Sequence, residues 1–110
     1  MCVNDTKVAR VRAAAPDAAV LQAVADRFGA LADPTRLRIL HALSRAELCV
    51  CDLASVTGRS MPATSQQLKL LRGLGFVTFR TEGKLAYYRL ADDRVLPLLA
   101  EAFGRDGARR

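Results

Sequence analysis

The chain has 110 residues, with 17 Lys or Arg against 11 Asp or Glu, which gives a formal net charge of +6. This length predicts one domain, and 51% hydrophobic residues with 25% charged ones are typical of a folded chain rather than a disordered one. No run of about 18 apolar residues is present, and charges interrupt the first twelve positions. These features exclude a helical membrane span and argue against a secretory signal, so we expect a cytoplasmic protein with no membrane partner.

The first half of the chain is predicted to be helical. We expect residues 1–16 to form a flexible arm, with at most a short helix near residues 3–11, and residues 17–110 to form the folded domain. Apolar residues at helical spacing after an N-capping Asp predict a helix over 17–31. A second Asp, followed by Pro, predicts the next helix, which ends near residue 44.

The second half changes its periodicity. A short helix over residues 50–56 is followed by Gly58 and by a helix that starts near Pro62 and carries a polar face. Two stretches rich in β-branched and aromatic residues then predict a basic β-hairpin, over 76–80 and 85–90. A last helix is expected to reach Phe103, followed by a frayed basic tail over residues 104–110.

This order of elements is that of a winged helix-turn-helix, so the predicted fold class is mainly α with a small β-hairpin. Between Arg59 and Arg89 six cations accompany one anion, Glu82, and this block coincides with the polar helix and the hairpin. A solvated surface on a plain helical bundle is the alternative, but we expect double-stranded operator DNA as the partner.

The expected DNA contacts divide by chemistry. Gln side chains can pair with adenine, and Ser and Thr hydroxyls can serve several bases, whereas Lys and Arg hold phosphates. The expected base and groove contacts are Ser60, Thr64, Ser65, Gln66 and Gln67, and the expected phosphate contacts are Lys69, Arg72, Arg80 and Lys84.

The cysteines are Cys2, Cys49 and Cys51, and the single histidine is His41. An odd number of cysteines argues against a disulfide framework. At a helix start, Cys49 and Cys51 could converge on one thiophilic ion as thiolates, with Cys2 of the same or a partner chain as the third sulfur. The alternatives are two small buried side chains, a redox or persulfide switch without metal, or a thiol enzyme. No nucleophile, base and orienting group are found together, so we expect no enzyme and no organic cofactor.

Residues 47–53, with the sequence ELCVCDL, resemble the metal box of the ArsR/SmtB family of bacterial metal-sensing repressors. The resemblance extends to residues 30–40, 65–72 and 82–90, although residues 65–67 read Ser-Gln-Gln where many relatives carry histidine. It implies a homodimer that binds operator DNA without metal and releases it when metal binds. The apolar first and last helices of the domain are expected to pack against the partner subunit.

Among the subtypes, the resemblance is to the CadC type, in which cysteines of the N-terminal arm reach the metal box of the other subunit. Cys2 resembles the inner arm cysteine, which implies a three-sulfur site that favours Cd(II) or Pb(II). As(III), Sb(III) and Bi(III) are alternatives that use the same cysteines, although Ala54 replaces the third cysteine of the arsenic-sensing branch. The zinc site of other members matches Asp92, Arg94, Arg105 and Ala108, and because arginine does not bind metal cations, we expect no regulatory zinc there.

Overall fold

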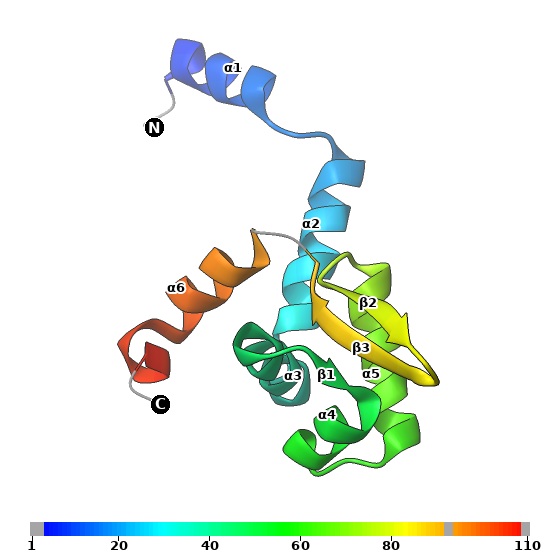
Figure 1. Cartoon of the computed structure of the whole chain (residues 1–110). Coiled ribbons are helices and arrows are strands. Elements are labelled where there is room, and N and C mark those ends of the chain that lie inside the picture. The colour runs from blue at the N-terminus through cyan, green and yellow to red at the C-terminus, as the bar shows by residue number, and fades with distance from the viewer. Residues whose placement is uncertain (1–3, 92–93, 109–110) are drawn as a thin grey trace.

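The computed structural model describes residues 4–91 and 94–108, with side chains described up to residue 104. Its elements follow one another along the chain as Figure 1 labels them. They are α1 (Asp5–Ala14), α2 (Ala18–Leu31), α3 (Pro34–Arg45), β1 (Leu48–Cys49), α4 (Val50–Thr57), α5 (Met61–Gly73), β2 (Val77–Glu82), β3 (Leu85–Leu90) and α6 (Val95–Ala108).

The capping residues account for the helix starts. The carboxylates of Asp17 and Asp33 accept hydrogen bonds from backbone N–H groups three residues later, at 2.9 and 3.0 Å, and the Ser60 hydroxyl does the same at 3.2 Å. At the other end of α4, Gly58 has a φ of 69°, a left-handed conformation that favours glycine. The helices expected from these signals are therefore confirmed to within two residues at each such end.

The sheet has three strands in the order β1-β3-β2, all antiparallel. The predicted hairpin is confirmed as β2 and β3, joined by a two-residue turn in which Gly83 has a φ of 63°. The sequence did not predict β1, because two residues are too few for a periodic pattern. This strand pairs with β3 directly before α4 begins.

The hydrophobic core lies among α3, α4, α5 and the start of the hairpin. Ile39, Leu40, Leu53, Leu68, Leu71 and Phe76 are fully buried there, and Val95 and Leu99 of α6 complete the cluster. Burial of each such side chain stabilises the fold by roughly 1.5–3 kcal/mol. The predicted winged helix-turn-helix is confirmed, with α4 and α5 as its paired helices and the hairpin as its wing.

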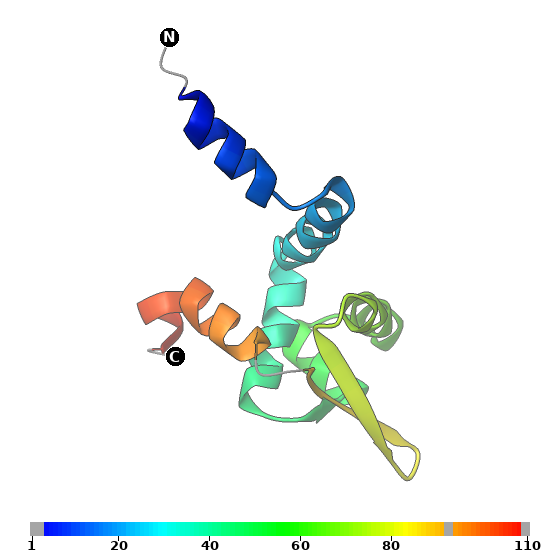
Figure 2. The same cartoon turned by 90° about the horizontal axis from the view of Figure 1, so that it is seen from above.

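The two ends of the chain differ from expectation in detail. Helix α1 is longer than predicted, has no buried residue and projects away from the body in both views (Figures 1 and 2). The chain was expected to fray past Phe103, but helical structure continues to Ala108. Gly104, with a φ of 55°, interrupts the helix. No helix in the described part of the chain is long and apolar enough to cross a membrane.

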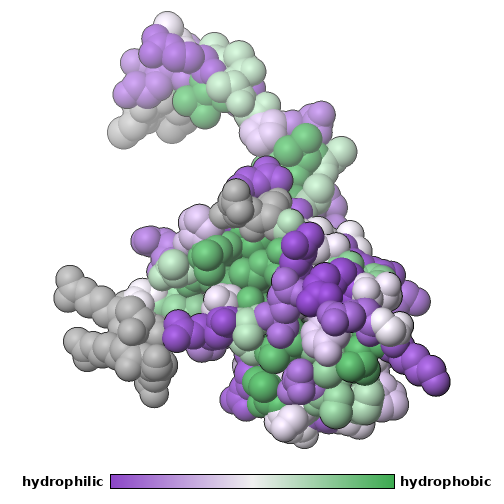
Figure 3. Space-filling model, viewed as in Figure 1, coloured by the Kyte–Doolittle hydropathy of each residue, from purple (hydrophilic) through white to green (hydrophobic). Residues whose placement is uncertain are grey.

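An apolar surface remains uncovered along α2 and α6. Figure 3 shows it as green atoms along α2 and between α2 and α6. Leu21, Val24 and Phe28 recur at helical spacing on α2 and are exposed, as is Leu96 of α6. Helix α2 is tied to the body by Arg27, whose Nη1 donates to the carbonyl of Leu74 at 2.8 Å.

Candidate nucleic-acid interface and thiol site

Helix α5 presents a polar surface to solvent, as expected for a DNA-reading helix. Ser65, Gln66, Lys69 and Arg72 are all exposed on it. Ser60 is exposed at its start, where the hydroxyl oxygen accepts from the N–H of Ala63. These side chains are free to meet a ligand that approaches the helix from solvent.

Thr64 is the exception on this helix and requires a correction. Its side chain is 1% exposed, and its hydroxyl donates to the carbonyl of Ser60 at 2.9 Å. The sequence pattern could not separate Thr64 from its polar neighbours, because a hydroxyl bonded one turn back along its own helix can be buried at little cost. Thr64 has no surface to offer DNA in this conformation.

Gln67 is only partly exposed, because it is bonded to α3. The Nε of Arg36 donates to Oε1 of Gln67 at 2.8 Å, and Nη1 of Arg36 donates to the carbonyl of Ala30 at 3.3 Å. Arg36 is half-buried and joins α3 to α5 and to the end of α2. The carbonyl oxygen of Gln67 is therefore engaged in holding the reading helix on the domain.

Arg80 of the wing lies between two carboxylates. Its Nε donates to Glu47 at 2.9 Å and its Nη1 to Glu82 at 2.7 Å, while the guanidinium sits 5.0 Å from the ring centroid of Tyr87. The hydrogen bonds to Glu82 and Glu47 raise the pKa of Arg80 above its ordinary value. A phosphate that approached Arg80 would have to compete with these carboxylates. Lys84, at the turn of the wing, is exposed and forms no ion pair with any residue that the structure describes.

The two metal-box cysteines lie where β1 passes into α4. Cys49 is 8% exposed and pairs with Tyr87 of β3. It is also the N-cap of α4, and its backbone N–H donates to Oδ2 of Asp52 at 3.4 Å. Cys51, in the first turn of α4, is exposed. Both thiols are free, so one sulfur is held inside the fold and the other faces solvent.

The two thiols of each chain could hold a thiophilic ion as soft ligands. Among the residues that the structure describes, no three His, Cys, Asp or Glu side chains gather as a metal site would require. Cys2, the expected third sulfur, lies outside the described residues. Two thiols are suitable ligands for a thiophilic ion, but they do not complete its coordination. A complete site needs a further ligand from elsewhere in the chain or from a partner subunit.

The positions matched to the zinc site of other family members are described only in part. Asp92 lies outside the described residues, as do the side chains of Arg105 and Ala108. Arg94 is exposed and lines a cavity with Arg27 and Phe76. The expectation that no zinc binds there stays a prediction.

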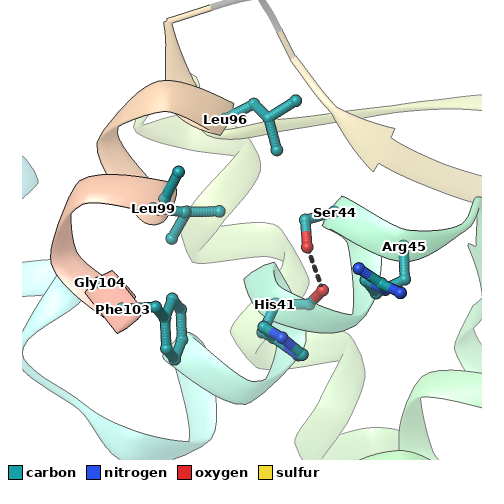
Figure 4. Close-up of a pocket in the computed structure, with 8 residues that line it drawn as sticks. His41, Ser44, Arg45, Leu96, Leu99, Phe103 and Gly104 are labelled. Carbon is teal, nitrogen blue, oxygen red and sulfur yellow. Dashed lines mark hydrogen bonds between the residues drawn. The ribbon is translucent and has the colours of Figure 1, made fainter. Parts of the chain in front are cut away.

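His41 packs against the last helix rather than beside the cysteines. Its ring lies 5.1 Å from the ring of Phe103, and both line a cavity of about 210 Å3 between α3 and α6. Figure 4 shows the Ser44 hydroxyl donating to the His41 carbonyl at the edge of this cavity. This aromatic packing agrees with a structural role for the histidine.

Two functional features were missed by sequence reasoning. One is Arg36, whose bond to Gln67 spans 31 residues of chain. The other is Glu47, which links the metal box to Arg80 of the wing across 33 residues. Neither hydrogen bond follows from a local periodicity in the sequence. The only feature that could have drawn attention to Glu47 was its position beside the cysteines.

Comparison with known proteins places this fold and site in a family. The model described as "Bacterial regulatory protein, arsR family" matches residues 33–78. The transcriptional repressor SmtB homolog of Synechocystis sp. is 50% identical over 80 residues, which are 73% of this chain and 61% of that protein. The cadmium resistance transcriptional regulatory protein CadC homolog of Staphylococcus aureus is 47% identical over 81 residues, 73% of this chain and 67% of that protein.

A solved structure agrees with these relatives. The homodimeric winged helix-turn-helix DNA-binding domain from Mycobacterium bovis, described as a possible ArsR-family regulator, superposes with a TM-score of 0.74 at 38% identity. The match covers 82% of this chain and 85% of that domain. The described thiols and wing lie on the same fold that this family uses to bind DNA. The chain belongs to the arsR family of bacterial transcriptional regulators, which are DNA-binding proteins and not enzymes.

Proposed function

We propose that this protein is a homodimeric repressor that releases operator DNA when Cys49 and Cys51 bind a thiophilic metal ion. The observation that carries the proposal is the position of the two free thiols, at the junction of β1 and α4. Cys49 ends a strand that is paired with the wing and caps the first helix of the helix-turn-helix. A change of position at this junction would therefore act on both DNA-contacting parts of the domain.

The favoured ions are Cd(II) and Pb(II), because thiolates are soft ligands and the chain offers few others. The relatives support a metal response but favour no single subtype, since the SmtB and CadC homologs are 50% and 47% identical. As(III), Sb(III) and Bi(III) could be bound by the same sulfurs. Cys2 is the proposed third ligand, donated by the arm of either subunit.

The DNA-contacting surface is proposed to combine α5 with the wing. Ser60, Ser65 and Gln66 would face base edges, and Gln67 would support them from the side that bonds Arg36. The phosphate contacts would be Lys69, Arg72, Lys84 and, once released from its carboxylates, Arg80. Thr64 is left out because it is buried.

The response is a linkage between two ligands of one dimer. Cys49 and Cys51 must hold the ion more tightly in the DNA-free form, and DNA must then weaken ion binding by the same factor. The apolar surface of α2 and α6 would join two copies and so fix the spacing of the two reading helices, and the relative from Mycobacterium bovis is homodimeric. Binding at the thiols would change that spacing or the position of the wings.

The test is DNA binding by fluorescence anisotropy, on a duplex that the reduced protein selects from a random-sequence library. We expect Cd(II) or Pb(II) to release the wild-type protein. The Cys49→Ser and Cys51→Ser variants should bind the duplex normally and resist release, while Cys2→Ser should reduce release only in part. Normal release from the Cys49→Ser, Cys51→Ser double variant would overturn the site assignment. Release by an oxidant or persulfide, with no effect of metal, would favour the thiol switch instead.

A further inference from the structure

We propose that a cavity beside the start of α5 binds a phosphate of the DNA backbone. The cavity measures about 180 Å3 and lies between the first turns of α3 and the end of α4. Its lining residues are Pro34, Thr35, Arg38, Thr57 and Arg59. The inference rests on the proposed DNA-binding surface and extends it to residues outside the face of α5 and the wing.

The charged side chains that line the cavity favour an anionic ligand. Arg38 lies on α3, and Arg59 lies in the turn between α4 and α5. Both side chains line the same cavity, and both residues are exposed. No carboxylate lines the cavity, and within the described part of the chain both ion pairs involve Arg80. Two guanidinium groups without carboxylate partners, held on one small cavity, attract an anionic group and can donate several hydrogen bonds to it.

The hydrogen bonding inside the cavity favours a ligand made only of acceptors. Nη2 of Arg59 donates to Oγ1 of Thr35 at 3.2 Å, which leaves the hydroxyl hydrogen of Thr35 available. Thr57 has no donor left for a ligand, because its hydroxyl donates to the carbonyl of Leu53 at 2.9 Å. The cavity therefore offers two guanidinium groups and one hydroxyl as donors, and the unprotonated oxygens of a phosphodiester supply matching acceptors.

The position of the cavity identifies the phosphate as one of DNA. Arg59 directly precedes Ser60, the N-cap of α5, in the turn that joins α4 to α5 at the lower edge of Figure 1. In a helix-turn-helix complex, the N-terminal residues of the second helix meet base edges, and the first helix crosses the backbone. A cationic cavity beside that N-terminus faces the strand that borders the groove. Arg38 and Thr35 would thus let α3 hold the backbone while α5 reads the bases.

The experiment measures how strongly salt weakens binding to a fluorescein-labelled duplex of mixed sequence, about 30 base pairs long, so that both half-sites fit. Anisotropy is followed from roughly 50 to 200 mM salt, where each phosphate contact contributes about 0.9 to the log–log slope. The Arg38→Ala, Arg59→Ala double variant should lose one contact per subunit, so the slope of a dimer should become shallower by about 1.8. The control is Arg45→Ala, which removes one positive charge from the other end of α3 and should leave the slope unchanged.

A second variant separates charge from folding. Arg38→Lys with Arg59→Lys keeps both cations and should retain most of the slope, even if the affinity falls. If the Ala pair keeps the wild-type slope while the wild type binds the duplex, the phosphate cavity is overturned and the proposed DNA-binding surface stands. Absence of wild-type binding to any duplex would instead overturn the proposed function itself.

Discussion

Cys49 lies directly opposite Tyr87 in the antiparallel pairing of β1 with β3. Tyr87 in turn lies opposite Arg80 on β2, and its ring is 5.0 Å from the Arg80 guanidinium. One row of residues therefore crosses the sheet from the metal box to a cation of the wing. Glu47, two residues before Cys49, closes the same path through its ion pair with Arg80. A displacement of β1 would move the carboxylate that restrains this arginine.

Glu47→Gln tests the restraint on Arg80. An exposed ion pair is screened by solvent and contributes little, so the free energy of unfolding should hardly change. The Arg80 guanidinium, then paired with Glu82 alone, should bind DNA more strongly at low salt and steepen the log–log salt slope by up to about 0.9 per subunit. Glu101→Gln, which removes one negative charge from the exposed surface of α6, is the control. Equal DNA binding by the two variants would show that Glu47 does not keep Arg80 from a phosphate.

Gln66 and Gln67 are neighbours in sequence with different predicted roles. Gln67→Ala should lower the free energy of unfolding by about 1–3 kcal/mol, because Arg36 would be left partly buried without its acceptor. Gln66→Ala should change stability by less than about 0.5 kcal/mol and should cost roughly 1–3 kcal/mol of discrimination at one base pair. Urea unfolding measures the first effect, and anisotropy on single-base variants of the selected duplex measures the second. A loss of base preference in Gln67→Ala alone, without loss of stability, would reverse the assignment.

The local signals in the sequence were enough to predict the main helices and the wing. Asp17 and Asp33 cap by contacts within three residues and Pro62 lies in the first turn of α5, so these residues marked the helix starts directly. The polar face of α5 could also be predicted. The burial of Thr64 could not, because its hydroxyl finds its partner one turn back, in the carbonyl of Ser60, and needs no solvent. Strand β1 and the partners of Arg36 and Glu47 depend on residues more than 30 positions away, and local patterns carry no information about such pairs.

The two metal-box thiols should differ in reactivity when no metal is present. Cys51 is exposed and Cys49 is 8% exposed, so iodoacetamide should modify Cys51 first. Peptide mapping by mass spectrometry follows each site with time, and prior addition of Cd(II) should protect both. Cys49→Ser and Cys51→Ser should both have little effect on stability, because a serine at the N-cap of α4 can accept a hydrogen bond from a backbone N–H of the first turn and residue 51 is exposed. Equal modification rates for Cys49 and Cys51 would contradict the burial seen here.

The apolar stripe on α2 predicts the dimer interface. Leu21 and Phe28 are 54% and 58% exposed on the same face of the helix as Val24, and a single chain has nothing described that covers them. A charge placed in such a surface would be buried without a partner on association, so Leu21→Arg should give a monomer in analytical ultracentrifugation. Because a monomer loses the second half-site, affinity for the selected duplex should fall on the order of 100-fold or more.

The matched control for the interface is Gln22→Arg, which adds the same charge one position along α2. Gln22 donates to Oδ1 of Asp26 at 2.9 Å, and an arginine there can keep a partner on that polar face. This variant should remain dimeric and should bind DNA at least as strongly as the wild type. Circular dichroism of both variants checks that the helices form, since Leu21 lies outside the core cluster and its replacement should leave the fold of each subunit intact. A Leu21→Arg protein that sediments as a dimer would mean that α2 is not the surface that joins the two subunits.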